Sequence, residues 1–284
     1  MSQIQEVWTV LKILNWTQEF FKSKHIESAR LDAEILLARV LKCERIFLYV
    51  NYEQPLMPSE LAEFKAMILQ RVAGQSIAYI LGEKQFMHYT LKVTPAVLVP
   101  RPETELLVEE VLNCYDNRPL QVLDMCTGSG AIGLALAGYR SEWQVTCSDV
   151  SAAALAIAGE NADSLGLSER IRFVESDMFA QLPPEKYQAL IANPPYIPLA
   201  DKKTLSKEVL AEPHLALFAA DEGLRFYKII AAQAAKYLEP QGRIFLEFGI
   251  GQAAAIERLF RDQGYKEILI KKDYAGIDRM MVIN

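Results

Sequence analysis

From residue 121 onward, short apolar stretches alternate with helical ones, and this alternation restricts the possible folds more than any other feature. The apolar stretches are Gln121–Met125, Gln144–Asp149, Ile171–Glu175, Ala189–Asn193 and Arg243–Phe248. Apolar runs of this length, separated by helical segments, predict parallel strands joined by crossover helices. We therefore expect an α/β domain with a doubly wound sheet, to which Glu267–Ile270 and Met280–Ile283 add a final antiparallel pair.

The part of the chain before this alternation reads as helical. Leu61, Phe64, Ile68 and Val72 share one face of a helix that begins at Pro58, and Ser28–Leu41 is a second amphipathic stretch. Tyr89 begins an extended segment, and a further helix follows over residues 104–112. We predict a small all-α domain over residues 1–84, a connecting segment over 85–95, and the α/β domain over 96–284.

Composition restricts the partners. The formal net charge is −6, which argues against affinity for nucleic acid through broad neutralisation of phosphates, so we expect no stable nucleic-acid binding. The four cysteines show no metal-ligand spacing with each other or with the three histidines, so we expect no metal. No stretch approaches the ~20 apolar residues that span a bilayer. We predict a protein of the cytoplasm with reduced thiols and no membrane association.

The stretch Val122–Gly130 is a buried strand that runs into a turn of small residues. Ligands of open α/β sheets bind at the carboxyl ends of strands, so we expect the turn's backbone amides and Asp124 to meet a polar group there. An isolated glycine pair such as Gly128 and Gly130 more often only closes a tight strand–helix connection. Further strand ends must decide between these interpretations.

Two more acidic residues follow the next strands. Asp149 lies 19 positions after Gly130, where a carboxylate can accept both hydroxyl protons of a ribose. Asp177 follows the third strand, where it can contact an adenine amino group while Met178 or Phe179 covers the ring face. The three strand ends together predict a nucleoside site. A nicotinamide enzyme also remains open, although no well-placed histidine is present to serve hydride transfer.

The fourth strand ends in Asn193-Pro194-Pro195-Tyr196. Such a turn can merely close a strand, but its place beside a nucleoside site favours a functional role. A planar amide or aromatic amine is a poor nucleophile because its nitrogen lone pair is delocalised. If the Asn193 side-chain oxygen and the Pro194 carbonyl each accept one N–H, they fix the nitrogen and favour the positive charge that grows on it during methyl transfer.

The other residues of this motif support the same chemistry. Tyr196 can pack on the planar group and orient it, while the two prolines remove competing N–H donors. In-line displacement then depends on positioning, and no dedicated base or metal is required. The motif predicts methylation of a planar nitrogen, and it suits adenine, guanine and glutamine equally.

Three further segments carry a family resemblance. They are residues 71–82 (Arg-Val-Ala-Gly-Gln-Ser-Ile-Ala-Tyr-Ile-Leu-Gly), residues 99–105 (Val-Pro-Arg-Pro-Glu-Thr-Glu), and residues 212–224, with Glu212-Pro213 and Leu224 at their ends. Together with the Asn-Pro-Pro-Tyr motif, they make the sequence resemble the HemK/PrmC release-factor glutamine methyltransferases over nearly its whole length. The resemblance implies a class I, Rossmann-like methyltransferase domain behind a helical domain that helps to dock the substrate.

The resemblance also implies the substrate, which is the glutamine of the Gly-Gly-Gln motif in class-1 peptide release factors, and the cofactor S-adenosylmethionine. The residues that it implies for the cofactor, together with those inferred above, are Asp124, Cys126, Thr127, Gly128, Ser129, Gly130, Asp149, Asp177, Met178 and Asn193. For the substrate they are Asn193, Pro194, Pro195, Tyr196, Arg101 and Glu105, of which Asn193, Pro194 and Tyr196 are the catalytic candidates.

The sequence departs from the family at Cys126, which stands where the family has the first glycine of Asp-x-Gly-x-Gly. A cysteine narrows the backbone conformations available there. Catalytic thiol chemistry is the alternative interpretation of Cys126, but no histidine lies near it in the sequence. Two other functions stay open: methylation of a base amino group in RNA or DNA through the same motif, and a non-catalytic nucleotide-binding module.

Overall fold

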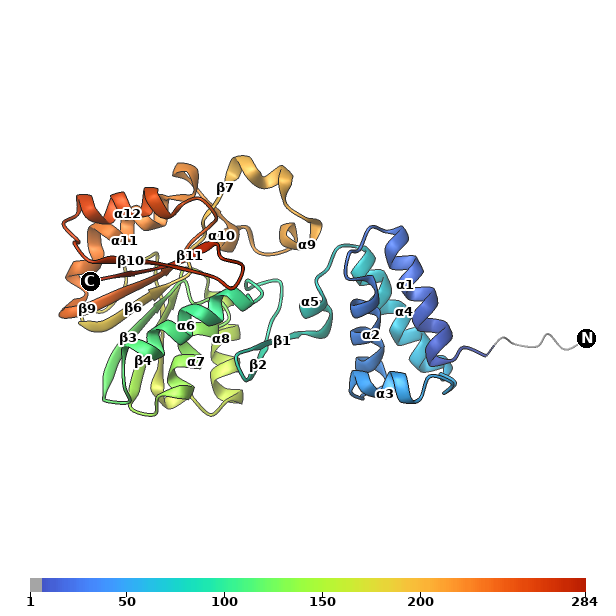
Figure 1. Cartoon of the computed structure of the whole chain (residues 1–284). Coiled ribbons are helices and arrows are strands. Elements are labelled where there is room, and N and C mark those ends of the chain that lie inside the picture. The colour runs from blue at the N-terminus through green and yellow to red at the C-terminus, as the bar shows by residue number, and fades with distance from the viewer. Residues whose placement is uncertain (1–6) are drawn as a thin grey trace, which may run out of the picture. The chain divides into compact units, whose positions relative to one another are not determined.

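The computed structural model describes residues 7–284, and contacts between residues divide the chain after Gly82 into two compact units. The first unit consists of helices (Figure 1). Two starts follow ordinary capping rules, because the Thr9 side chain accepts a hydrogen bond from the Lys12 amide at 3.4 Å and Pro58 occupies the first turn of its helix. The helices are α1 (Val10–Ser23), α2 (Ala29–Val40), α3 (Arg45–Val50), α4 (Pro58–Val72) and α5 (Ile77–Leu81).

The first unit has its own hydrophobic core. Phe21, Leu36, Leu37 and Phe64 are fully or almost fully buried in it, and they come from α1, α2 and α4. Both helices predicted in this part of the sequence are present, as α2 and α4.

The second unit contains a seven-stranded sheet with the order β10-β11-β9-β6-β3-β4-β5. The five strands that the sequence predicted as parallel are parallel, and the predicted terminal pair is antiparallel. The fold is therefore the predicted doubly wound one. The strands of this sheet are β3 (Leu120–Met125), β4 (Trp143–Asp149), β5 (Ile171–Glu175), β6 (Tyr187–Ala192), β9 (Leu238–Glu247), β10 (Ile268–Lys272) and β11 (Asp278–Ile283).

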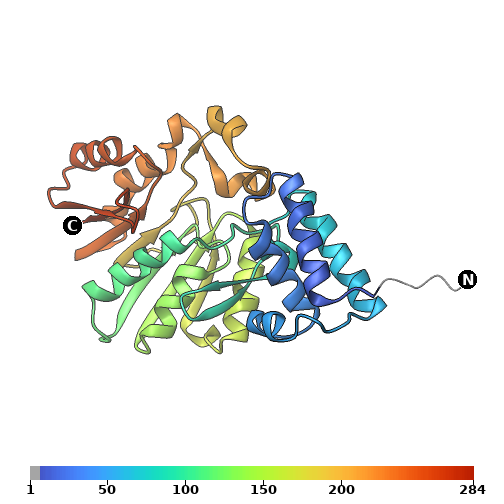
Figure 2. The same cartoon turned by 45° about the vertical axis from the view of Figure 1, so that its right-hand side comes forward.

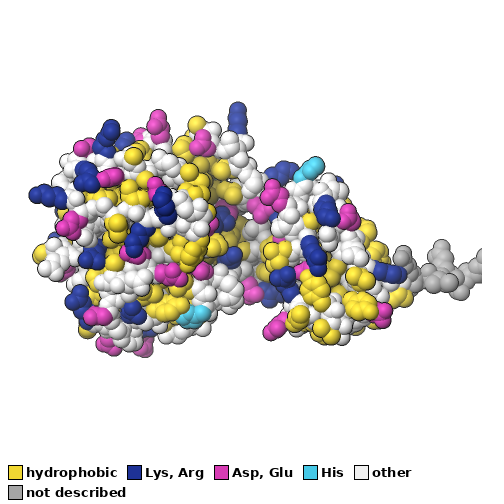
Figure 3. Space-filling model, in the orientation of Figure 1, with side chains coloured by type: hydrophobic (Ala, Val, Ile, Leu, Met, Phe, Trp, Pro, Cys, Tyr) yellow, Lys and Arg dark blue, Asp and Glu magenta, His cyan; other side chains and the backbone are white. Residues whose placement is uncertain are grey.

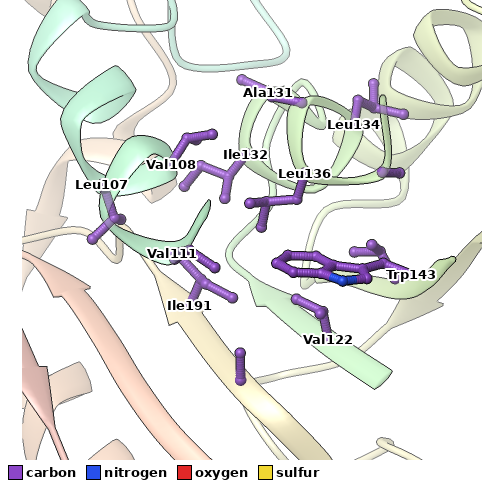
Figure 4. Close-up of a cluster of buried hydrophobic side chains, with 14 of the residues drawn as sticks. Leu107, Val108, Val111, Val122, Ala131, Ile132, Leu134, Leu136, Trp143 and Ile191 are labelled. Atoms are coloured by element: carbon purple, nitrogen blue, oxygen red, sulfur yellow. The ribbon is translucent and has the colours of Figure 1, made fainter. Parts of the chain in front are cut away.

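Helices cover both faces of this sheet, as Figures 1 and 2 show from two directions. One face packs against α6 (Pro102–Cys114), α7 (Ala131–Tyr139) and α8 (Ala152–Ser164), and the other against α11 (Arg225–Gln233) and α12 (Ala253–Asp262). On the first face, Val108 of α6, Leu136 of α7 and Trp143 of β4 belong to one buried cluster (Figure 4). Burial on both faces explains why the central strands read as continuous apolar runs rather than alternating ones.

A β-hairpin precedes the sheet. Its strands are β1 (Glu83–Phe86) and β2 (Tyr89–Lys92), so the stretch expected to be a connecting segment has regular structure. Phe86 and Leu91 lie in the core beneath α6 and α7. Asn161 of α8 holds the hairpin by accepting from the Lys92 amide at 2.7 Å and donating to the Lys92 carbonyl at 3.1 Å. The hairpin therefore packs as part of the second unit.

Between β6 and β9 the chain forms short elements around the end of the sheet. In addition to α11 they are β7 (Ile197–Pro198), η2 (Leu199–Thr204), α9 (Lys207–Leu210), α10 (His214–Leu217), β8 (Phe218–Ala219), η3 (Asp221–Gly223) and η4 (Ala234–Lys236), and η1 (Ser168–Arg170) precedes β5. Over the face drawn in Figure 3, basic and acidic side chains are interspersed. Within residues 7–284, no helix has the length and apolar character needed to cross a bilayer.

Candidate active site

The turn after β3 has a backbone that requires small residues. Cys126, Gly128 and Gly130 all have positive φ, at 60°, 56° and 83°. At Gly130 a side chain is disfavoured on two grounds, because a Cβ would lie 2.8 Å from Leu134 Cδ1 and the left-handed conformation is unfavourable for other residues. The turn leads directly into α7.

Asp124 lies beneath this turn and stabilises it. Its Oδ2 accepts hydrogen bonds from the Thr127 hydroxyl at 2.5 Å and from the Gly133 amide at 2.9 Å. Burial raises the pKa of Asp124 to about 7, although both hydrogen bonds act in the opposite direction. The side chain does not line the neighbouring cavity, so Asp124 contacts the turn rather than the space in front of it.

Several amides of the turn are bonded inside the protein, which differs from the expectation that they face a ligand. The Thr127 amide donates to the Ser148 carbonyl at 3.0 Å, and the Gly130 amide donates to the Thr127 carbonyl at 2.9 Å. Thr127, Ser129 and Gly130 do not line the cavity, whereas Cys126 and Gly128 do. The reason is that these donors are paired with carbonyl groups of β4 and of the turn itself, so that only the outer edge of the turn stays accessible.

Asp149 is the last residue of β4 and lines the cavity beside Gly128. The Gly128 amide donates to its Oδ2 and the Ser151 amide donates to its Oδ1, both at 2.9 Å. Burial raises the pKa of this carboxyl, and the backbone hydrogen bonds oppose the shift. Fixed backbone N–H donors orient the carboxylate, which has about four lone-pair sites in all and so keeps capacity for a hydroxyl donor.

Asp177 and Met178 follow β5 and line the same cavity. Asp177 is exposed, and its amide donates to the Gln181 side chain at 2.9 Å. Met178 is buried, with φ at 53°, and its sulfur lies 4.0 Å from that of Cys126. An exposed carboxylate beside a buried thioether suits a ring with a polar edge and an apolar face.

The cavity at these strand ends has apolar walls that the sequence did not identify. Residues from the segment before α6 and from the region of α10 and α11 close it. The residues that line the first cavity are Ala96, Val97, Leu98, Met125, Cys126, Gly128, Ser148, Asp149, Val150, Ser151, Ala154, Ser176, Asp177, Met178, Asn193, Pro195, Pro213, Leu215, Ala216 and Phe226.

A second cavity adjoins the first, and Asn193, at the end of β6, lines both. Leu98 and Ala216 are also shared. Pro194 is buried and lines neither cavity, while Pro195 lines the first and Tyr196 the second. The residues around the second cavity are Leu98, Arg101, Glu103, Asn193, Tyr196, Ile197, Leu205, Val209, Ala216, Leu217, Glu247 and Arg279.

The Asn193 side chain is held from behind. Its Nδ2 donates to the Thr104 hydroxyl at 3.2 Å, and Thr104 in turn donates to Glu247 Oε2 at 2.6 Å. Burial raises the pKa of Glu247 to about 7, against the hydrogen bond from Thr104 and the charge of Arg279. Neither Glu247 nor Arg279 belongs to a local sequence motif, so the sequence alone did not indicate that they lie at the site.

Tyr196 is fixed through its backbone. Its carbonyl oxygen accepts a hydrogen bond from Gln252 Nε2 at 2.9 Å. The same oxygen packs against Gly223 so closely that a Cβ added to Gly223 would lie 2.1 Å from it. Gly249 packs as closely against the ring, since its Cβ would lie 2.9 Å from Tyr196 Cδ2. Burial raises the pKa of Tyr196 to about 12, so the phenol stays protonated at neutral pH.

Arg101 and Glu105 have different positions. Arg101 lines the second cavity and donates to Glu212 Oε1 at 2.5 Å, and burial raises the pKa of Glu212. Glu105 instead accepts a hydrogen bond from the Met87 amide at 2.8 Å and lines neither cavity. Glu103 occupies the cavity side of α6, because two residues along a helix turn the side chain by about 200°.

The Cys126 thiol is unsuited to nucleophilic chemistry. Burial raises its pKa well above the ordinary value, and the nearby carboxylates of Asp149 and Asp124 add to the shift. Only the thiolate is an effective nucleophile. The thiol therefore fills space beside Met178 rather than reacting.

Comparison with protein families gives two matches. Residues 12–82 match the model described as the PrmC N-terminal domain, and residues 102–220 match the model described as the methyltransferase small domain. The chain is also similar to proteins named release factor glutamine methyltransferase. The protein from Geobacter sulfurreducens is 38% identical over 99% of this chain and 98% of its own length. The protein from Leptospira interrogans is 40% identical over 97% of this chain and 98% of its own length. The protein from Coxiella burnetii is 43% identical over 90% of this chain and 92% of its own length.

Solved structures resemble the fold. A methyltransferase from Pyrococcus furiosus matches with a TM-score of 0.53 at 16% identity, covering 77% of this chain and 96% of its own. The hMettl16 catalytic domain, solved with an RNA hairpin, matches with a TM-score of 0.56 at 17% identity, covering 81% and 83%. At such identities the likeness concerns the fold alone.

Proposed function

Because the chain belongs to the release factor glutamine methyltransferase family, we infer that it transfers a methyl group from S-adenosylmethionine to the side-chain amide nitrogen of a release-factor glutamine. The near-complete coverage of relatives at 36–43% identity carries this conclusion. The glutamine of the Gly-Gly-Gln motif in class-1 factors is the substrate we propose, and the cytoplasm, where translation terminates, is the place of action.

The first cavity fits S-adenosylmethionine. Asp149 presents two oriented oxygens for ribose hydroxyls, and Asp177 with Met178 suits the edge and face of the adenine. Phe226 and Leu98 add apolar wall. The cofactor, when bound, supplies an electrophilic methyl group on its sulfonium. We propose that Cys126 and Gly128 complete the site at the edge of the turn.

The second cavity is where we place the substrate glutamine. Asn193 lies at the junction of the two cavities, which is where an acceptor nitrogen must meet the methyl group. We propose that Asn193 Oδ1 and the Pro194 carbonyl accept the two N–H groups of the substrate amide. Two acceptors on one nitrogen favour the positive charge that forms as the methyl group is transferred.

Tyr196 and Arg101 shape the second cavity around the substrate. The Tyr196 ring, fixed between Gly249 and the Gln252 hydrogen bond, is positioned to pack on the planar amide. Arg101 keeps its guanidinium against Glu212, whose side chain is 1% exposed. We propose that this ion pair orients the segment before α6, so that Leu98 separates the two cavities.

The first unit is the part that we propose docks the release factor. Its surface exposes aromatic side chains, among them Trp16, Tyr49 and Tyr52, each exposed by nearly half. Tyr49 and Tyr52 line a shallow hollow together with Leu11. Exposed aromatic residues around a hollow are typical of protein contact surfaces. Replacing Tyr52 by alanine should then raise KM for the factor and leave kcat unchanged.

The function is tested by incubating the protein with a release factor and methyl-labelled S-adenosylmethionine, followed by mass spectrometry of the factor's peptides. The label should appear on a single glutamine and disappear when that glutamine is replaced. Labelling of ribosomal RNA in place of the factor would contradict the assignment.

The role of Asn193 is tested separately. Asn193→Ala should lower kcat roughly 100- to 1,000-fold, as loss of a preorganised transition-state contact does, while the cofactor Kd stays within about twofold. Asn117→Ala is the matched control, because Asn117 is exposed and bonds Ser141 outside both cavities. If the chain were a non-catalytic nucleotide-binding module, neither the wild type nor Asn193→Ala would methylate the factor.

A further inference from the structure

A chain of two hydrogen bonds lies behind Asn193 and connects three elements. Asn193 follows β6, Thr104 belongs to α6, and Glu247 is the last residue of β9. The sheet register pairs Ala192 with Leu246, so Asn193 and Glu247 each stand one residue beyond a paired position. Thr104 and Glu247 are 4% and 1% exposed, and solvent therefore does not compete for their hydrogen bonds.

The direction of each hydrogen bond in this chain follows from the donors available. A threonine hydroxyl has one proton, and an ionised carboxylate can only accept. Thr104 therefore gives its proton to Glu247, at 2.6 Å, and accepts from Asn193 Nδ2, at 3.2 Å. An asparagine side chain has one NH2 group and one oxygen, so an NH2 group held by Thr104 leaves Oδ1 to face the cavities.

We propose that Glu247, acting through Thr104, is a positioning residue that sets which end of the Asn193 side-chain amide faces the substrate. The inference rests on the proposed function, in which Asn193 Oδ1 accepts an N–H of the glutamine amide. With the Asn193 amide reversed, its NH2 group would meet the NH2 group of the substrate. Two donors cannot bond each other, and the substrate nitrogen would lose one of its two acceptors.

The charge state of Glu247 makes the arrangement sensitive to pH. The charged and titratable groups facing it are Arg279 from β11, Glu103 from α6, and the hydroxyls of Tyr196 and Tyr227. Burial raises the pKa of Glu247 to about 7, because the cost of burying the charge outweighs the attraction of Arg279, which acts to lower the pKa. Below that pH the carboxyl group is protonated and can donate to Thr104, whose own proton then turns toward Asn193 and favours the reversed amide. We expect kcat to rise with pH through about 7 and then level off.

Three substitutions in the full-length protein test this. Thr104→Val removes the hydroxyl with little change of shape and should lower kcat about 10- to 100-fold, the effect of one lost hydrogen bond of this kind. Thr104→Ser keeps the hydroxyl and should restore kcat to within about threefold of the wild type. Glu247→Gln should lower kcat by less, about 2- to 10-fold, because glutamine can present either end to Thr104, and it should abolish the acid limb of the pH profile.

The measurements are kcat and KM for a purified release factor, the Kd of S-adenosylmethionine, and kcat from pH 5.5 to 9. Thr17→Val is the matched control, because Thr17 in α1 is fully buried and its hydroxyl has no partner within residues 7–284. Its kcat should equal that of the wild type. The cofactor Kd should stay unchanged in all four variants, since Thr104 and Glu247 do not line the first cavity.

The outcomes separate the two proposals. Equal impairment of Thr104→Val and Thr104→Ser, or an acid limb that persists in Glu247→Gln, overturns the positioning role while the methylation of the factor stands. If the wild-type protein leaves the factor unmethylated, the proposed function fails and this inference fails with it. Should Thr104→Val not fold, the pH comparison of wild type and Glu247→Gln decides alone.

Discussion

Asp149→Asn should weaken S-adenosylmethionine binding while the fold stays intact. The carboxylate accepts the Gly128 and Ser151 amides at 2.9 Å through its two oxygens. An asparagine has one oxygen and one NH2 group, so one of the two backbone donors must face another donor. The remaining oxygen must then serve a backbone amide and the ribose, and one charge-assisted hydrogen bond to the ribose is lost.

A hydrogen bond to a charged group contributes about 1.5–3 kcal/mol, which corresponds to a roughly 10- to 150-fold increase in Kd. Calorimetric titration of the purified variant with S-adenosylmethionine measures this increase. Asp262→Asn is the control, because it changes the net charge equally at an exposed position of α12. A Kd for Asp149→Asn within twofold of that of Asp262→Asn would refute the assignment of Asp149 to the cofactor.

Three further predictions concern the turn after β3. Gly130→Ala should destabilise the protein more than Gly276→Ala, by about 1–3 kcal/mol in the free energy of unfolding, and should therefore lower Tm further. Both glycines have positive φ, but only at Gly130 does the added Cβ meet Leu134. Equal shifts of Tm in a melting experiment would exclude this reason. Burial raises the pKa of Asp124 to about 7, above its value in the unfolded chain, so the folded state favours the protonated carboxyl group. The stability that this contributes is fully present below pH 4 and is lost as the pH rises to about 7, by up to about 4 kcal/mol in the free energy of unfolding. In urea unfolding from pH 4 to 8, the free energy of unfolding should fall less for Asp124→Asn than for the wild type. Parallel pH curves for the two proteins would contradict the assignment of this pH dependence to Asp124. Cys126 should react with iodoacetamide at pH 8 far more slowly in the folded protein than in urea, as peptide mass spectrometry would show, because burial raises its thiol pKa.

Much of the fold follows from local patterns. Strands buried on both faces are apolar along most of their length, and this pattern predicted β3, β4 and β6. The other two predicted parallel strands, β5 and β9, were found as shorter apolar runs between helical segments. The helix starting at Pro58 was equally readable from its capping residue and apolar spacing. The extended segment predicted from Tyr89 is present as β2, but its pairing with β1 was not predicted, because Phe86 and Leu91 are single apolar residues whose burial depends on the core into which they pack.

The candidate site divides in the same way. Asp149, Met178 and Asn193 could be predicted because the carboxyl ends of parallel strands meet at one edge, and the structure brings all three to the first cavity. Glu105 was predicted from its place in a motif, yet helix geometry turns it to the Met87 amide. Motif membership does not determine which side of a helix a residue occupies unless the direction of the core is known.

Glu247 shows what additional knowledge would have been needed. Its sequence neighbours form an ordinary buried strand, and nothing in that stretch indicates an active site. Strand order supplies the missing information, because β9 lies beside β6 and their register places Glu247 next to Asn193. A carboxylate at the end of a buried strand is costly unless it is bonded, and here the Thr104 hydroxyl and the Asn193 side chain bond it. Glu247 is therefore a buried carboxyl group directly behind the residue that must present an oxygen, and its side-chain hydrogen bonds are to Thr104 and Asn193. This location is the strongest physical reason to assign Glu247 to the orientation of Asn193.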